Sequence, residues 1–145
     1  MMNRMQKLFK NRKKGFTLVE LIVVLVILAI LLAILVPSLT KWIDKAKEKQ
    51  ILVDARTAYL ACQTVASEAY GGIGEANVDA EAKVFTAAGI DAAKDLAGVT
   101  GTIANVTVTD NYTVDGMTYT NNGKTATLAN GIWTVADETA SGGES

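Results

Sequence analysis

The sequence predicts an α+β fold in which a long N-terminal helix packs against a small antiparallel sheet. Two observations predict this fold. The chain contains no glycine between Phe16 and Tyr70, and apolar residues recur there at three- and four-residue steps, the spacing of one helix face. From residue 102 onward threonine and valine dominate, and Asp-Gly or Asn-Gly pairs recur, as in strands joined by tight turns. A length of 145 residues leaves room for one domain and little more.

Composition excludes several classes of site. The sequence has no histidine, and its single cysteine, Cys62, can form neither an internal disulfide nor a thiolate metal cluster. Catalytic triads that depend on histidine are excluded for the same reason. The 14 basic and 15 acidic side chains give a net charge of −1, which argues against a strongly basic nucleic-acid-binding protein. We therefore expect a protein that is not an enzyme and that binds no metal and no cofactor.

The first 39 residues divide into a basic and an apolar segment. Residues 1–15 carry six basic side chains and no acidic one, whereas residues 16–39 carry a single charge, Glu20. Twenty-four helical residues span roughly 36 Å, more than the hydrocarbon core of a bilayer. We predict that residues 16–39 cross a membrane, with the basic flank in the cytoplasm. A cleaved secretory signal peptide fits less well, because this apolar run is long and its alanines do not form a small-x-small cleavage site.

Residues 40–70 are predicted to continue the same helix, now with one apolar face. That face is formed by Leu52, Ala55, Tyr59, Cys62, Ala66 and Ala69. Pro37 lacks a backbone donor and is expected to kink or locally loosen the helix. The helix of about 55 residues should then end at the glycines that follow it, Gly71, Gly72 and Gly74.

The rest of the chain predicts the head of the molecule. Residues 71–101 are expected to form a connecting loop with one or two short alanine-rich helices, broken near Gly89. Residues 102–136 predict a meander of about four strands, whose apolar face the amphipathic helix would cover. The predicted turns are Asp115-Gly116, Asn122-Gly123 and Asn130-Gly131. Residues 137–145 are predicted to be a frayed polar tail.

The junction between the basic and apolar segments reads Lys-Lys-Gly-Phe-Thr-Leu-Val-Glu over residues 13–20. It closely resembles the type IV pilin family, which includes the pseudopilins of type II secretion and competence systems. Precursors in this family carry a short basic leader that ends in glycine, then phenylalanine, and then an apolar helix with glutamate at its fifth position. Counted from Phe16, Glu20 is fifth and Pro37 is twenty-second, where many members also have proline. The resemblance is tight over residues 10–40, and the head matches only in architecture.

The resemblance implies a processing site and an assembly site. A membrane-embedded prepilin peptidase would cut after Gly15, removing the leader 1–15, and would methylate the new amine of Phe16. Glu20 would pair with that amine on a neighbouring subunit and so set the register of each entering subunit. Alternatively, Glu20 merely favours the positive end of the helix. Pro37 either permits local unwinding in the fibre or only marks the end of the lipid-buried segment.

The resemblance also implies a function and a set of partners. The chain would be a structural subunit of a type IV pilus, single-pass in the cytoplasmic membrane with a cytoplasmic N-terminus, and then part of a surface filament for adhesion, motility or DNA uptake. Its partners would be copies of itself in a helical homopolymer, the peptidase, the assembly platform with its ATPase, membrane lipid before assembly, and minor pilins. Some pseudopilins bind calcium, for which Asp110 and Asp115 are candidates, although aspartates also form turns.

Two other functions remain open at this point. The first is a pseudopilin of a type II secretion or competence system, which would form a short fibre. The second belongs to a different class, a signal-anchored extracellular binding domain that never polymerises. Loss of residues 1–15 and methylation of Phe16 would distinguish the first from the second.

Overall fold

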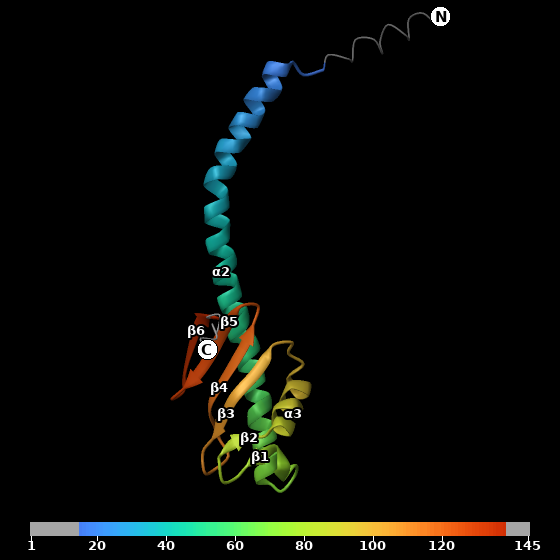
Figure 1. Cartoon of the computed structure of the whole chain (residues 1–145), viewed down its shortest axis with the longest axis vertical. Coiled ribbons are helices and arrows are strands. Elements are labelled where there is room, and N and C mark those ends of the chain that lie inside the picture. Colours follow the sequence, from blue (N-terminus) through green and yellow to red (C-terminus); the bar gives the residue numbers. More distant parts are fainter. Residues whose placement is uncertain (1–14, 139–145) are drawn as a thin grey trace, which may run out of the picture. The chain divides into compact units, whose positions relative to one another are not determined.

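The computed structural model describes residues 15–138, so most of the predicted leader and residues 139–145 of the predicted tail lie outside it. The chain divides into two compact units, Met1–Trp42 and Ile43–Ser145. One helix, α2 (Leu18–Tyr70), runs for 53 residues and supplies part of each unit (Figure 1). The predicted α+β fold and its long N-terminal helix are confirmed.

The described part of the first unit is the apolar stretch of α2 and the three residues before it. Every residue from Gly15 to Trp42 is exposed, including the large apolar side chains. The helix is unbroken in secondary structure through Pro37. The hydroxyl of Ser38 donates to the carbonyl of Ile34 at 3.3 Å, and that of Thr40 donates to the carbonyl of Pro37 at 3.0 Å. These side chains therefore bond to the carbonyl of Pro37 itself and to a carbonyl one turn before it.

The C-terminal end of α2 lies at the glycines that the sequence predicts. The backbone N–H of Ile73 donates to the carbonyl of Glu68 at 2.9 Å, and that of Gly72 donates to the carbonyl of Ala69 at 3.1 Å. Gly72 has a φ of 84°, the left-handed conformation that ends a helix and that glycine adopts without steric cost. This pair of bonds is a Schellman motif, and it satisfies carbonyls that the helix itself leaves free.

Residues 71–101 contain more regular secondary structure than the connecting loop that was expected. They form a short 3₁₀ helix, η1 (Glu75–Asn77), two short strands, β1 (Val78–Asp79) and β2 (Val84–Phe85), and the helix α3 (Ala87–Ala97). The predicted break near Gly89 is wrong, because α3 passes through it. A Cβ on Gly89 would lie 2.0 Å from the carbonyl oxygen of Asn77, so the glycine reflects a close backbone approach and not a helix break.

Within residues 15–138 the sheet contains six antiparallel strands in the order β1-β2-β3-β4-β5-β6, two more than the four or so expected. The four main strands are β3 (Thr102–Val108), β4 (Val114–Asn121), β5 (Lys124–Ala129) and β6 (Ile132–Asp137). The additional strands β1 and β2 have two residues each, too few to show an alternating pattern in the sequence. Asp137, predicted to begin the polar tail, is the last residue of β6.

Two of the three predicted turns are confirmed. Asn122-Gly123 and Asn130-Gly131 join β4 to β5 and β5 to β6, and all four residues have a positive φ between 51° and 77°. That backbone is the two-residue hairpin turn that Asn-Gly favours.

The predicted turn at Asp115-Gly116 is wrong, because both residues lie within β4. The carboxylate of Asp115 accepts a hydrogen bond from the hydroxyl of Thr107 at 2.6 Å, and a Cβ on Gly116 would lie 2.6 Å from that same hydroxyl. Both residues are thus accounted for by their cross-strand neighbour on β3. The chain turns earlier, at Thr109–Thr113, where the N–H of Thr109 donates to the carbonyl of Thr113 at 2.9 Å.

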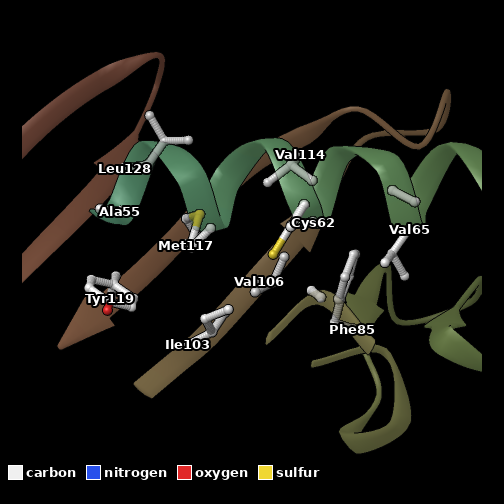
Figure 2. Packing of buried hydrophobic residues seen from close by; sticks show 14 of the residues in the cluster. Ala55, Cys62, Val65, Phe85, Ile103, Val106, Val114, Met117, Tyr119 and Leu128 are labelled. Carbon is white, nitrogen blue, oxygen red and sulfur yellow. The ribbon is translucent and has the colours of Figure 1, made fainter. Parts of the chain in front are cut away.

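The core of the second unit lies between α2 and the sheet (Figure 2). Of the predicted helix face, Ala55, Cys62, Ala66 and Ala69 are buried, while Leu52 and Tyr59 are half-buried. The centre of the face also includes Ile51, Ala58 and Val65, which are buried. The sulfur of Cys62 points toward Val106 of β3 (Figure 2). The prediction that the amphipathic part of α2 covers the sheet is therefore confirmed. The buried face of the helix is, however, centred on a position rotated about the helix axis from the predicted one.

Candidate functional site at the start of the apolar helix

The backbone around Gly15 and Phe16 is exposed and non-helical, and α2 begins only at Leu18. A Cβ on Gly15 would have no atom within 4 Å apart from its immediate neighbours. The side chain of Phe16 is 77% exposed. The Gly15–Phe16 peptide bond is thus open to an approaching molecule, and no contact of the described residues holds it in place.

Thr17 and Glu20 form a reciprocal cap at the start of α2. The N–H of Glu20 donates to the hydroxyl of Thr17 at 3.2 Å, and the N–H of Thr17 donates to the carboxylate of Glu20 at 3.3 Å. This is the capping box, in which two backbone donors that a helix start leaves free are satisfied by side chains. The cap places the start of α2 directly after Phe16, so the peptide bond at Gly15 stays outside the helix.

Glu20 is the one charged residue in the apolar stretch 16–39. Its carboxylate is favoured near the positive end of the helix, by about 0.3–1 kcal/mol at an exposed site. In lipid a carboxylate needs a stronger partner than a helix end, because an unpaired charge there costs several kcal/mol. In this structure, the backbone N–H of Thr17 is the partner that the described residues provide.

Pro37 lies on the same helix as Glu20, 17 residues further along the chain, which corresponds to roughly 25 Å of helix. The two residues are therefore not brought together within one chain. Gly15, Phe16 and Glu20, by contrast, are close neighbours around the helix start.

The structure separates the two aspartates considered for calcium. Asp110 forms an ion pair with Lys83, and Asp115 accepts from Thr107 as described above. Among residues 15–138 no group of three or more histidine, cysteine, aspartate or glutamate side chains could hold a metal ion. Cys62 is buried, and this burial raises the pKa of its thiol to about 12, so it lacks the thiolate character of a reactive cysteine.

Sequence reasoning missed one charged cluster, around Lys124 of β5. The Lys124 side chain is 10% exposed, and its Nζ lies 2.6 Å from Oδ1 of Asp137 and 3.8 Å from Oε1 of Glu48. The hydrogen bond to Asp137 raises the pKa of Lys124, although burial opposes this, and the same bond lowers the pKa of Asp137. The sequence pattern that could have revealed this cluster is the alternation along β5, which places Lys124 on the same buried face as Ala126 and Leu128.

The apolar stretch of α2 is the one helix among the described residues that is long and apolar enough to cross a membrane. None of its most apolar window is buried by the rest of the chain. By length and composition it fits a membrane anchor near the N-terminus.

Comparison with known proteins gives one match. Residues 10–36 match a protein family described as "Prokaryotic N-terminal methylation motif". No curated protein and no solved structure matches the chain. The match spans the Gly15-Phe16 bond, the capping box and most of the apolar helix, and it is consistent with a prepilin precursor of the type IV pilin kind. The motif thus supports an exported, pilin-like or pseudopilin precursor, a kind of protein known for structural roles and not as an enzyme.

Proposed function

We propose that the chain is the precursor of a type IV pilus subunit, cleaved after Gly15, methylated on the amine of Phe16 and polymerised through its apolar helix into a surface filament. The observation that carries the proposal is the combination at the helix start. An exposed, non-helical Gly15–Phe16 bond is followed at once by a capped helix whose apolar side chains have no cover within the described chain. The methylation motif spans this same region.

Cleavage would change the charge of the chain as well as its length. The leader carries six of the 14 basic side chains, so the processed chain keeps 8 basic and 15 acidic ones, a net charge of −7. A basic leader favours a cytoplasmic N-terminus before cleavage, because positive flanks are retained on that side of a membrane. The peptidase would therefore act on the cytoplasmic side, and an acidic head would lie outside.

Cleavage would also create a partner for Glu20. The new amine of Phe16 lies one residue before Thr17, whose N–H already donates to the Glu20 carboxylate. A positive amine binds a carboxylate more strongly than a neutral N–H does. We infer that Glu20 exchanges its capping bond for the amine of a neighbouring subunit, which would align each new subunit with the last.

Polymerisation would give the apolar helix a permanent cover. In a bilayer, the side chains of residues 16–39 are solvated by lipid, and in a fibre they would be buried by copies of the same helix. Head-to-tail packing that does not close on itself produces a filament. Because lipid and neighbouring helices are both apolar, the transfer releases little hydrophobic free energy. An assembly platform with an ATPase would supply the work of extraction.

Processing can be tested by mass spectrometry of the protein from its native host. The expected mature chain begins at Phe16 and carries a methyl group on its amine. Gly15→Leu is the matched control. A Cβ at position 15 would meet no atom within 4 Å apart from the neighbouring residues, so this variant should keep the head folded and remain uncleaved. Detection of residues 1–15 on all of the wild-type protein would contradict the proposal.

Assembly can be tested by electron microscopy of material sheared from the cell surface. Long fibres containing the processed chain are the expected result. Glu20→Ala should be cleaved normally but yield few fibres. A pseudopilin remains the second candidate, because it would carry the same methylation motif; short fibres that stay in the envelope would favour it. A chain that is neither processed nor found in fibres of either kind would leave only the signal-anchored domain that does not polymerise.

A further inference from the structure

A hollow of about 500 Å³ lies at the end of the head where α2 stops. It is lined by Ala69, Tyr70, Glu75, Val78, Ala80 and Tyr112. These residues come from the end of α2, from η1, from β1 and the residue after it, and from the turn between β3 and β4 (Figure 1). Its volume lies within the range typical of pockets for small molecules. Neither the proposed processing nor the proposed assembly uses this hollow.

Two tyrosines form adjacent walls of the hollow. The ring centroids of Tyr70 and Tyr112 are 5.5 Å apart, and the ring planes are inclined at 56°. Tyr70 is the last residue of α2 and is 68% exposed, whereas Tyr112 is half-buried. Aromatic rings attract organic cations through their negative faces, and pairs of inclined rings form part of the aromatic cages that bind quaternary ammonium groups.

The turn that carries Tyr112 is held in place by Gln63 of α2. The amide nitrogen of Gln63 donates to the carbonyl of Tyr112 at 3.2 Å, and its amide oxygen accepts from the N–H of Val114 at 2.9 Å. Tyr112 also has a φ of 57°, a left-handed conformation that is uncommon for a bulky residue and that needs support from its surroundings. The backbone that carries Tyr112 is therefore held in place, which lowers the cost of ordering this side of the hollow around a ligand.

The charge around the hollow is negative. Glu75 lines it, and its carboxylate has no hydrogen bond or ion pair with any other residue of the described range 15–138. Asp79 and Glu81 flank the lining residue Ala80 in the chain. Lys83 is nearby in sequence, but its ammonium is paired with Asp110. The surroundings thus favour a cation over an anion.

We propose that this hollow binds a small organic cation with a quaternary ammonium group, of the choline class. Such a group buries methyl groups against tyrosine faces and the apolar Ala69 and Val78, while Glu75 balances its charge. A free cation is favoured over a phosphocholine headgroup, since the acidic surroundings would repel the phosphate.

The test is an NMR titration of the full chain in a maltoside detergent, which carries no ammonium group. Tetramethylammonium chloride is added while the methyl signals of Ala69, Val78 and Ala80 are followed. We expect saturable shifts that sodium chloride at equal ionic strength does not cause. In a second titration, choline should bind about two- to fivefold more tightly than its uncharged analogue 3,3-dimethyl-1-butanol, the range expected for an exposed cation–π contact. Absence of saturable shifts, or equal binding of the analogue, would overturn the proposal.

Three variants test the residues that carry the proposal. Tyr70→Leu and Glu75→Gln should each weaken tetramethylammonium binding, whereas Glu81→Gln, an exposed carboxylate outside the lining, should not. The methyl signal of the core residue Ala55 reports whether each variant is folded. If Tyr70→Leu does not fold, the result for Glu75→Gln alone decides whether the site exists. If Glu81→Gln weakened cation binding as much as Glu75→Gln does, the effect would be one of overall negative charge, and the proposed site would be contradicted. Phosphocholine binding as tightly as choline would overturn the assignment to a free cation.

Discussion

Thr17 and Glu20 satisfy each other's backbone N–H groups, at 3.2 and 3.3 Å, in the chain that still carries Gly15. The carboxylate of Glu20 therefore has two separable properties. It accepts a hydrogen bond, which caps the helix, and it carries the charge that the proposed amine contact requires. Substitutions can remove one property and leave the other.

Glu20→Gln should be cleaved normally and assemble poorly, because an amide oxygen still caps Thr17 but carries no charge for the amine of Phe16. Thr17→Ala should retain assembly, because it costs about 1 kcal/mol of helix capping and leaves the carboxylate charged. Mass spectrometry of the N-terminus and the yield of sheared fibres measure the two effects. Full fibre yield from Glu20→Gln would show that the helix cap alone accounts for this glutamate.

The stability of the head should depend on pH through Lys124 and Asp137. Because Lys124 lowers the pKa of Asp137, their contribution is present above the ordinary aspartate pKa of 3.8 and is lost as the pH falls through the lower folded value. Because the pKa of Lys124 is raised, the contribution is present below 10.5 and is lost as the pH rises through the folded value. Circular dichroism melts of wild type and Asp137→Asn should thus differ most between these limits.

The control for this pair is a second carboxylate near the same lysine. Glu48 lies 3.8 Å from Lys124, and its contribution to the stability of the head should be smaller than that of Asp137, which lies at 2.6 Å. A melting difference between wild type and Asp137→Asn that stays unchanged once NMR shows the Asp137 carboxyl to be protonated would refute the ionic origin of the effect.

Gly89→Ala should destabilise the head, by about 1–3 kcal/mol as for other overpacked sites. In an unconstrained helix the same change stabilises, because alanine has the higher helix propensity. Here the added Cβ would lie 2.0 Å from the Asn77 carbonyl oxygen, so α3 must move away from η1. The sign of the change in thermal unfolding is the test. Ala88→Gly, at an exposed neighbouring position of α3, measures propensity alone.

Cys62 should react with Ellman's reagent only after unfolding. With a pKa of about 12, roughly one thiol in ten thousand is ionised at pH 8, and the side chain is fully buried. The chain has a single cysteine, so one absorbance trace reports its reaction. Fast labelling of the folded chain would mean that the helix–sheet core opens readily.

Local patterns predicted the elements that depend on local conformation. The absence of glycine between Phe16 and Tyr70 indicates an unbroken helix, and Asn122-Gly123 and Asn130-Gly131 indicate hairpins, because each depends on backbone angles within a few residues. The same holds for the helix start, where Thr17 and Glu20 are three residues apart. Asp115-Gly116 carries the same turn pattern but lies in a strand, since its contacts are with Thr107 on the neighbouring strand.

The sequence by itself determined the long helix, its apolar and amphipathic halves, and the motif around Gly15, Phe16 and Glu20, because periodicity and short motifs act over neighbouring residues. The tertiary structure alone decided why Gly89 is a glycine, which carboxylate pairs with Lys124, and that Tyr70 and Tyr112 share one hollow. Each of these joins segments far apart in the chain. Their proximity in space follows from how the helices and the sheet pack, which no local pattern encodes.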